Sequence, residues 1–310
     1  MEVNKFGGAS IRDSSGVKNL LSILKTKKKE KLFIVVSAMG KTTNNFEKVV
    51  QNYFDNQKDL DYSLKFIYDY HYQIINELFE NSRHKIFEDL KLIFKAIKDF
   101  LMKNKSPNFS FVYDQVVSNG ELISSKIIYE YLNENGILIN WIDAREIIKT
   151  DSKHRGAKVK WDETNQKISE KIDLKMANIT QGFIASDDNN FTTTLGREGS
   201  DYSAAIIAYG LNAKSLTIWK DVPGVLNADP KLFENPVLLK DISYGETIEL
   251  AFYGASVIHP KTLQPLQKKE IPLYVKPFLN PNSQGTKITR GVDINPKVPC
   301  YIVKKNLFLL

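Results

Sequence analysis

Near the N-terminus, two consecutive glycines join a strand pattern to a helix pattern. Residues 3–6 form a short segment with an apolar side chain at each end, which predicts a strand, and they run directly into the glycines. Apolar residues then recur at i, i+3, i+4 and i+7 over residues 17–24, which predicts a helix that Asp13 or Ser14 can cap. The continuous apolar run 32–36 is typical of a strand buried on both faces of a parallel sheet. A βαβ unit at the start of the chain therefore favours the α/β class.

The alternation of helices and strands continues along the chain. Helices are predicted at 118–135, 200–209, 244–253 and 260–269, and strands at 137–142, 179–185, 192–195, 215–219 and 272–275. Residues 283–287 are predicted to form a closing loop, and residues 301–310 resemble one or two strands. Aromatic and aliphatic residues from 44 to 104 lie at helical spacing, which predicts two or three helices in a subdomain over one edge of the sheet. The pattern predicts helices on both faces of the sheet.

Composition narrows the classes of function. The chain has 310 residues with 43 Lys plus Arg against 36 Asp plus Glu, a formal charge of +7. The lysine-rich run 25–31 lies where a solvated helix end favours cations, so no nucleic-acid partner is expected. No apolar run approaches the ~18 residues of a membrane span, and no secretory signal begins the chain, so a cytoplasmic protein without membrane contact is expected. A single cysteine, Cys300, excludes an internal disulfide.

Lys5 stands at the end of the first predicted strand, just before Gly7 and Gly8. Glycines at this place allow backbone N–H groups to approach a polyanion such as a phosphate. The spacing matches neither the P-loop nor the dinucleotide-binding pattern, so a plain tight turn explains it equally well. The loop is therefore a candidate phosphate site that needs support from a second sequence motif.

A second loop places Arg197 between Gly196 and Gly199, directly before Ser200 and Asp201. An arginine in this position can clamp a carboxylate through two parallel hydrogen bonds. Ser200 and Asp201 also fit a structural role as an N-cap and as an acid near a helix N-terminus, but that role leaves the arginine unexplained.

Two further groups of residues have structural explanations. Ser118 and Glu121 have the spacing of a capping box, in addition to any role in binding. Turn chemistry explains the Pro, Gly and Asp residues of 221–231. His71, His84 and His154 are interpreted as ordinary surface residues and His259 as a helix-start residue. No group of residues has metal-ligand or Ser-His-Asp spacing.

In order and spacing, seven segments resemble the aspartokinases, within the amino acid kinase superfamily. They are KFGGAS at 5–10, VSA at 36–38 with TN at 43–44, SNGE at 118–121, TQGF at 180–183, the stretch 192–204, DVPG at 221–224 with Ala228-Asp229-Pro230, and FYGASVIHP at 252–260. The resemblance covers residues 3 to about 288, with the helical stretch 44–104 matched only in position.

The resemblance implies a three-layer α/β/α sandwich with a mainly parallel central sheet and a helical insertion. It also implies transfer of the ATP γ-phosphoryl group to the side-chain carboxylate of L-aspartate, giving 4-phospho-L-aspartate for lysine, threonine and methionine biosynthesis. Phosphoryl transfer mainly requires two anions to be positioned and charge to be neutralised, and a lysine, an arginine and glycine loops are suited to this.

Site residues follow from the resemblance position by position. The catalytic pair would be Lys5, which bridges phosphoryl oxygens, and Asp201, which orients Lys5. The aspartate pocket would contain Ser37, Thr43, Glu121, Phe183, Arg197 and Ser200, with Glu121 on the substrate ammonium and Arg197 on its carboxylate. ATP would contact Lys5, Gly7, Gly8, Ser10, Lys220, Asp221, Leu226, Asp229, Lys231 and Ser256. Mg²⁺ would be held mainly by phosphate oxygens and water, without protein metal ligands.

Four positions depart from the family pattern. Ala9 replaces Thr, Glu198 replaces Gly and Leu226 replaces an aromatic residue. Ser256 stands where many members have a phosphate-binding lysine, and Lys220 and Lys261 are the candidate replacements.

The domain organisation implied is a catalytic domain at 1–295 with a helical insertion at about 44–104. Its aspartate-binding half would extend to about residue 210 and its nucleotide-binding half over about 211–295. Residues 296–310 would be a linker and the first strand of a truncated or absent ACT domain. A homodimer is possible. Two alternatives remain: an amino acid kinase with another acceptor, and a non-catalytic nucleotide- or amino-acid-binding paralogue.

Overall fold

The computed structural model describes residues 1–27, 32–55, 59–252 and 257–301. Within them, eight strands form one sheet in the order β3-β4-β2-β1-β7-β9-β10-β8. The strands are β1 (Glu2–Phe6), β2 (Leu32–Val36), β3 (Ile139–Ile142), β4 (Ala177–Gln181), β7 (Ser215–Lys220), β8 (Asp241–Ser243), β9 (Leu273–Pro277) and β10 (Thr286–Thr289). Every pair of neighbours is parallel except β9 and β10. The predicted mainly parallel sheet is confirmed.

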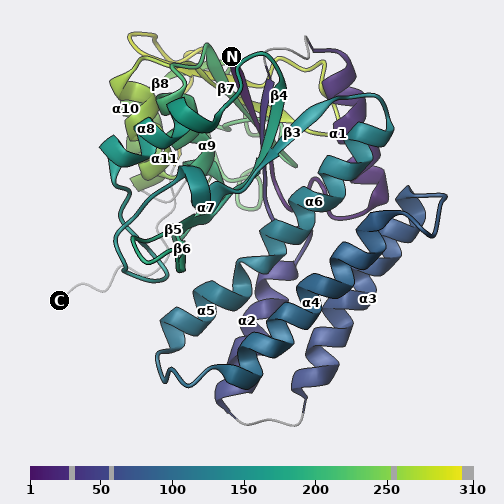
Figure 1. Ribbon diagram of the computed structural model, residues 1–310. Coiled ribbons are helices and arrows are strands. Elements are labelled where there is room, and N and C mark those ends of the chain that lie inside the picture. The colour runs from purple at the N-terminus through teal and green to yellow at the C-terminus, as the bar shows by residue number, and fades with distance from the viewer. Residues whose placement is uncertain (28–31, 56–58, 253–256, 302–310) are drawn as a thin grey trace.

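Helices cover both faces of this sheet (Figure 1). One layer contains α1 (Ser14–Lys25), α2 (Thr42–Phe54), α3 (Leu60–Leu78), α4 (Lys85–Lys103), α5 (Phe109–Val117) and α6 (Asn119–Glu134); the other contains α7 (Ala144–Ile147), α8 (Trp161–Lys171), α9 (Gly199–Gly210), α10 (Tyr244–Phe252) and α11 (Pro260–Lys268). Alternate residues of a strand face opposite layers, so Ile34 packs into one core and Val35 into the other. The predicted three-layer sandwich is confirmed.

The seam between β1 and β7 sets the position of the site. All strands on one side of the seam come from residues before 182, and those on the other side come from residues after 214. The chain leaves β1 through α1 to β2 on one side of the seam, but leaves β7 for β8 at the far edge on the other side, so the connections diverge at this seam. In open α/β sheets, ligands bind at the carboxyl ends of the strands where the connections diverge.

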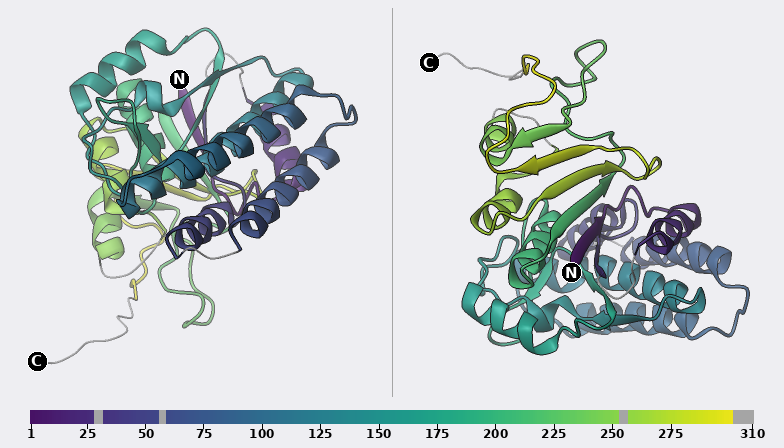
Figure 2. Two further views of the ribbon diagram at one scale, coloured as in Figure 1. Left: turned by 60° about the horizontal axis from the view of Figure 1, so that its bottom comes forward. Right: turned by 90° about the horizontal axis from the view of Figure 1, so that it is seen from above.

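Helices α2, α3 and α4 occupy the stretch predicted to be helical, and α5 extends the group beyond it. Figure 2 shows these helices projecting from one side of the sheet. Their buried residues recur at helical spacing, as with Ile67, Ile74 and Leu78 in α3, which packs them into the same core as α1. Helices α5, α7 and α8 and strands β8 and β10 were not predicted, because they are short and weakly periodic.

The predicted strand 179–185 is wrong as a single element. β4 ends at Gln181, and β5 (Ile184–Ser186) instead pairs antiparallel with β6 (Thr192–Thr194) in a separate two-stranded sheet. Phe183 has a left-handed φ of 66°, which breaks the extended backbone between them.

Three smaller predictions have different outcomes. The loop expected at 283–287 is partly strand, because β10 begins at Thr286 and its Oγ1 is held by the Leu239 carbonyl. Asp13 caps α1 as predicted. Most of the predicted strands at 301–310 lies outside the described residues.

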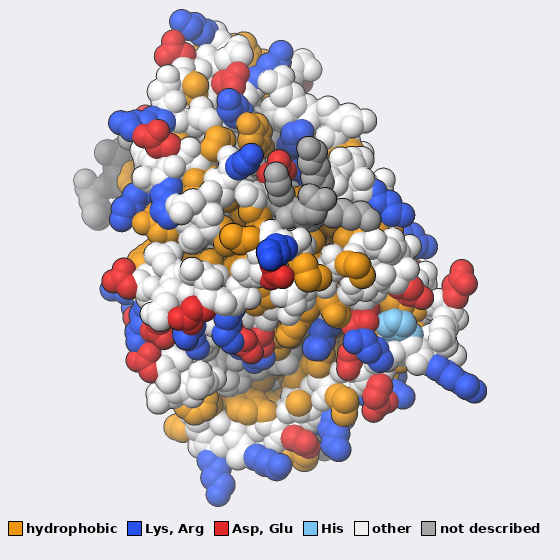
Figure 3. All heavy atoms as spheres, turned by 45° about the horizontal axis from the view of Figure 1, so that its top comes forward, with side chains coloured by type: hydrophobic (Ala, Val, Ile, Leu, Met, Phe, Trp, Pro, Cys, Tyr) orange, Lys and Arg blue, Asp and Glu red, His pale blue; other side chains and the backbone are white. Residues whose placement is uncertain are grey.

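Among the described residues, no helix has the length and apolar character needed to cross a membrane. On the face shown in Figure 3, positive and negative side chains are interspersed. Part of the lysine-rich run 25–31 lies outside the described residues.

Candidate active site

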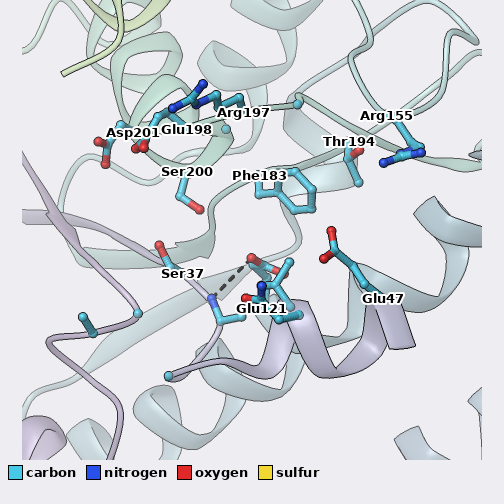
Figure 4. Close-up of a pocket in the computed structure, with 18 of the residues that line it drawn as sticks. Ser37, Glu47, Glu121, Arg155, Phe183, Thr194, Arg197, Glu198, Ser200 and Asp201 are labelled. Carbon is cyan, nitrogen blue, oxygen red and sulfur yellow. Dashed lines mark hydrogen bonds between the residues drawn. The ribbon is translucent and has the colours of Figure 1, made fainter. Parts of the chain in front are cut away.

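A pocket of about 610 Å³ lies at the carboxyl end of β1, between the first turn of α9 and helices α2 and α6. Nine residues expected from the sequence line it: Lys5, Gly8, Ser37, Thr43, Glu121, Phe183, Arg197, Ser200 and Asp201. These come from segments up to 196 residues apart in sequence, from Lys5 to Asp201, and Figure 4 shows several of them around one cavity. The structure therefore brings the expected catalytic pair and the expected aspartate pocket together.

Two lysines from neighbouring strands share one buried carboxylate at the inner end of the pocket. Lys5 Nζ lies 2.7 Å from Asp201 Oδ1, and Lys220 Nζ lies 3.1 Å from Asp201 Oδ2. Burial of Asp201 acts to raise its pKa, but the two ammonium groups outweigh burial and hold the pKa below its usual value. Asp201 therefore stays ionised and fixes the position of both lysines.

Glu121 lies in the first turn of α6, but it does not complete a capping box. Ser118 makes no side-chain capping bond, because its hydroxyl donates to the Gln115 carbonyl instead. Glu121 Oε1 accepts a hydrogen bond of 3.3 Å from the Ala38 amide, while Oε2 is buried without a hydrogen-bond partner. Burial raises the pKa of Glu121 to about 8. The capping-box interpretation is wrong, and the carboxyl is left for the pocket (Figure 4).

The loop before α9 carries the arginine expected to bind a carboxylate. Glu198, with a left-handed φ of 53°, occupies the N-cap position, so the interpretation of Ser200 as N-cap is wrong. Ser200 lies one residue inside the helix and faces Gly182. A Cβ at Gly182 would lie 2.5 Å from the Ser200 Cβ, so this close approach requires glycine. Arg197, Glu198 and Ser200 all line the pocket.

Glycines also shape the loop after β1. The Gly40 amide donates to the Gly8 carbonyl, and a Cβ on Gly8 would lie 2.3 Å from the Ala38 carbonyl oxygen. Two backbone segments thus pass closely beside Lys5, and their contact requires Gly8 to lack a side chain.

Of the expected nucleotide residues within the described ranges, only Lys5 and Gly8 line this pocket. Gly7 and Ser10 lie in the loop after β1, with the Ser10 hydroxyl buried and without a hydrogen-bond partner. Lys220 ends β7 and lies beside the Asp201 carboxylate. Asp221, Leu226, Asp229 and Lys231 lie along the turns after β7, and Asp229 accepts from the Lys231 amide. Ser256 lies outside the described residues.

Several pocket residues were missed by reasoning from the sequence. Glu47, Tyr113, Arg155 and Thr194 form part of the wall opposite Asp201 (Figure 4). Tyr113 donates a 2.7 Å hydrogen bond to Glu47, and the Arg155 guanidinium lies 4.5 Å from the centre of the Tyr113 ring. Glu47 and Tyr113 lie on helices, Thr194 ends β6 and Arg155 lies in a loop, and none of them belongs to a recognisable local motif, so the sequence held no signal for them.

A buried carboxylate in α5 fixes this wall. Asp114 accepts hydrogen bonds from the Thr194 hydroxyl at 2.7 Å and from the Arg155 amide, and its carboxylate lies 2.8 Å from His154 Nδ1. His154 is therefore not an ordinary surface residue.

His71 is also fully buried, and burial lowers its pKa to about 4. His84 and His259 cap α4 and α11, the latter as expected.

Comparison with known protein families shows to which family this chain belongs. A family model described as the amino acid kinase family matches residues 1–277. The chain belongs to the amino acid kinase family. Aspartokinase 1 of Arabidopsis thaliana, a chloroplastic protein, is 33% identical over 99% of this chain and 55% of its own length. Lysine-sensitive aspartokinase 3 of Escherichia coli is 29% identical over 99% of this chain and 68% of its own.

The amino acid kinase matches include longer proteins. Bifunctional aspartokinase/homoserine dehydrogenase 1 of Arabidopsis thaliana is 31% identical over 94% of this chain, which spans only 33% of that relative. Among solved structures, Escherichia coli aspartokinase III in complex with aspartate and ADP superposes with a TM-score of 0.87 at 28% identity, covering 94% of this chain and 65% of that one. The fold expected from the resemblance is confirmed by this match.

Proposed function

We propose that this chain is an ATP-dependent phosphotransferase that acts on the side-chain carboxylate of L-aspartate. The observation that carries the proposal is the pocket itself: a lysine–aspartate pair at one end, with Glu121, Arg197 and Ser200 beside it. These groups complement a phosphoryl group and a zwitterionic dicarboxylate. The similarity to aspartokinases, one of them solved with aspartate and ADP, supports the same acceptor.

The proposed mechanism assigns each charged residue one task. Arg197 binds a substrate carboxylate through its guanidinium, and Glu121, once ionised, accepts the substrate ammonium. A carboxylate oxygen of the substrate attacks the γ-phosphorus, the bond between γ-phosphorus and bridging oxygen breaks, and ADP leaves with the electron pair. Lys5, held by Asp201, neutralises charge on the transferring oxygens.

The side chains in the pocket fit a magnesium ion that arrives bound to the nucleotide, because they do not form a metal site of their own. Within the described ranges, no group of three or more His, Cys, Asp and Glu side chains could hold a metal, and Asp201 is already engaged by two lysines. Phosphate oxygens and water would therefore hold Mg²⁺, which supplies charge neutralisation at the β- and γ-phosphates when bound. The absence of protein metal ligands remains a prediction.

The division of the chain into two substrate-binding halves belongs to the same proposal. We place the aspartate-binding half before about residue 210 and the nucleotide-binding half at about 211–295, with the helical insertion at about 44–104. The turns after β7, which carry Asp221, Leu226, Asp229 and Lys231, would contact the nucleotide. A cytoplasmic homodimer that serves lysine, threonine and methionine biosynthesis is proposed from the similarity alone.

Release of ADP by the purified protein with Mg-ATP tests the proposal. L-aspartate should stimulate release, whereas L-glutamate, N-acetylglutamate and no acceptor should not. Lys5→Ala should lower turnover by at least about 100-fold, since a preorganised charge is lost. Stimulation by another acceptor would favour a different amino acid kinase, and ATP binding without any stimulated turnover would favour a non-catalytic paralogue.

A further inference from the structure

We propose that the cleft between α8, α9 and α11 is a binding site for a small aromatic carboxylate, separate from the active-site pocket. These three helices lie in the same layer of the sandwich (Figure 1). The cleft has a volume of about 340 Å³, which is within the range of small-molecule sites, and it shares no lining residue with the active-site pocket. Its aromatic and charged lining residues are Trp161, Asp162, Tyr202, Tyr209, Lys261 and Lys268.

Two aromatic rings in the cleft pack against each other. The rings of Trp161 and Tyr209 meet edge to face, with centroids 5.0 Å apart and 67° between their planes. Lys269 Nζ lies 4.0 Å from the centre of the Tyr209 ring and donates to the Tyr209 carbonyl. The Tyr209 ring is therefore held in place from two directions before any ligand binds. A fixed pair of rings favours a ligand that carries an aromatic ring of its own.

Lys261 gives the cleft an ammonium group without an acidic partner. Among the described residues it forms no ion pair, and Nζ donates only to the Leu195 carbonyl, at 3.2 Å. An ammonium has three donor protons, so two remain available. Burial lowers the pKa of Lys261, because no carboxylate compensates for the lost water. Although Lys261 is a candidate replacement for a lysine at position 256, it lines this cleft and not the active-site pocket.

The Tyr202 side chain lies beside that ammonium and carries an unpaired hydroxyl group. Tyr202 is 7% exposed, and its ring centre lies 4.5 Å from Lys261 Nζ. Its hydroxyl makes no hydrogen bond with any residue that the structure describes, and burial raises its pKa above the ordinary value of 10.0. The hydroxyl therefore keeps its proton near neutral pH. A carboxylate can accept from this hydroxyl with one oxygen and from the ammonium with the other.

The remaining charges of the cleft also favour an anion. Lys268 lines the cleft and forms no ion pair with another described residue, and Asp162 is the only acid among the described lining residues. Both of these side chains are exposed. Two lysines against one aspartate leave a net charge of +1, so the cleft attracts a carboxylate more than a neutral or cationic ligand.

Calorimetric titration of the full chain with phenylacetate tests the inference, with phenylacetamide and cyclohexylacetate as matched probes. Phenylacetate should bind with a Kd of about 1 mM or lower. Phenylacetamide keeps the ring but loses the charge, so it should bind at least about tenfold more weakly. Cyclohexylacetate keeps the charge but lacks the aromatic ring, so it should bind about threefold more weakly.

Variants of the two proposed donors locate the site. Lys261→Met should weaken phenylacetate binding at least about tenfold and leave phenylacetamide within a factor of about two, whereas Lys261→Arg should recover most of the affinity. Tyr202→Phe should weaken phenylacetate about threefold. Lys167→Met is the matched control, because this lysine of α8 pairs with Glu170 and lies outside the cleft, and it should change neither affinity.

Arg197→Met controls for binding in the active-site pocket, where an arginine could also take the carboxylate. R197M should leave phenylacetate affinity within a factor of about two, and loss of binding in R197M would overturn the inference. Equal binding of phenylacetate and phenylacetamide, no binding at about 10 mM, or wild-type affinity in K261M would overturn it as well. If K261M does not fold, Y202F must still weaken phenylacetate selectively. None of these outcomes depends on kinase activity, so the inference and the proposed function can fail separately.

Discussion

Asp201 and Glu121 are both buried carboxyl groups in the same pocket, yet their pKa values move in opposite directions. Burial acts to raise the pKa of each. Asp201 lies against two ammonium groups, which reverse the effect of burial and keep it ionised. At Glu121 the long hydrogen bond from the Ala38 amide does not offset burial, so burial dominates. The pocket thus contains one permanent anion and one carboxyl whose charge depends on pH and on the ligand.

The raised pKa of Glu121 predicts a pH-dependent cost to stability. Folding raises the pKa from its ordinary value of 4.5 to about 8, so the folded state binds more protons between these two values. The free energy of unfolding should therefore fall as pH rises from about 4.5 to about 8 and level off above. Replacing Glu121 by a neutral residue should therefore raise the free energy of unfolding by roughly 3 kcal/mol more at pH 8.5 than at pH 5.5, since each unit of pKa shift corresponds to 1.36 kcal/mol.

Urea denaturation of wild type and Glu121→Gln at pH 5.5 and pH 8.5 measures this difference. Glu88→Gln, an exposed residue of α4, serves as a control for loss of a surface carboxylate. An advantage of E121Q that is the same at both pH values would show that Glu121 is already ionised at pH 5.5.

At the scale of elements, the pocket depends on backbone segments that approach one another closely. The turn after β4 lies against the first turn of α9 at Gly182 and Ser200, and the Gly182 amide also donates to the Val36 carbonyl. The Asp114 carboxylate of α5 likewise joins β6 to the loop that carries Arg155. The position of each pocket side chain is therefore decided by contacts between elements.

Gly182→Ala should disturb α9 and the pocket together. Its Cβ would lie within 2.7 Å of three Ser200 atoms, so we expect a loss of about 1–3 kcal/mol from overpacking and a higher KM for the acceptor. Gly245→Ala is the control, because its nearest neighbour is Ser243 Oγ at 4.0 Å and it lies in α10. That change should stabilise the protein by about 0.5–1 kcal/mol. Equal effects of the two variants on urea denaturation would contradict the close contact.

At the scale of the whole molecule, the sheet separates two hydrophobic cores that its strands hold together. Val3 and Phe6 of the same strand pack into different cores, and β1 and β7 join the two groups of strands. Each core is lined by fully buried aliphatic residues, such as Leu24 in α1 and Leu263 in α11. Neither layer of helices can separate from the sheet without exposing strand residues to water.

This arrangement predicts one cooperative unfolding transition. Leu24→Ala and Leu263→Ala should each lower stability by about 2–5 kcal/mol and shift the same calorimetric peak. The two variants act in opposite layers and in opposite proposed halves of the chain. Two separate transitions, each moved by only one of the variants, would show instead that the halves before and after residue 210 unfold independently.

Most of the regular elements could be predicted from the sequence, because their signals are local. The short strand pattern of β1, the continuous apolar run of β2 and the helical spacing of α1 and α3 each lie within fewer than 20 residues. These patterns determined the α/β class, the mainly parallel sheet and the glycine loop beside Lys5. The resemblance of spaced segments then indicated which residues belong to one site.

Tertiary structure alone decided what those residues do there. Ser118 and Glu121 have the spacing of a capping box, but packing of α6 against the segment after β2 directs Glu121 to the Ala38 amide instead. Lys220 and Asp201 look like turn and helix-start residues until the β1–β7 seam brings them to Lys5. The charge of each group depends on burial and on neighbours distant in sequence, which no local pattern encodes.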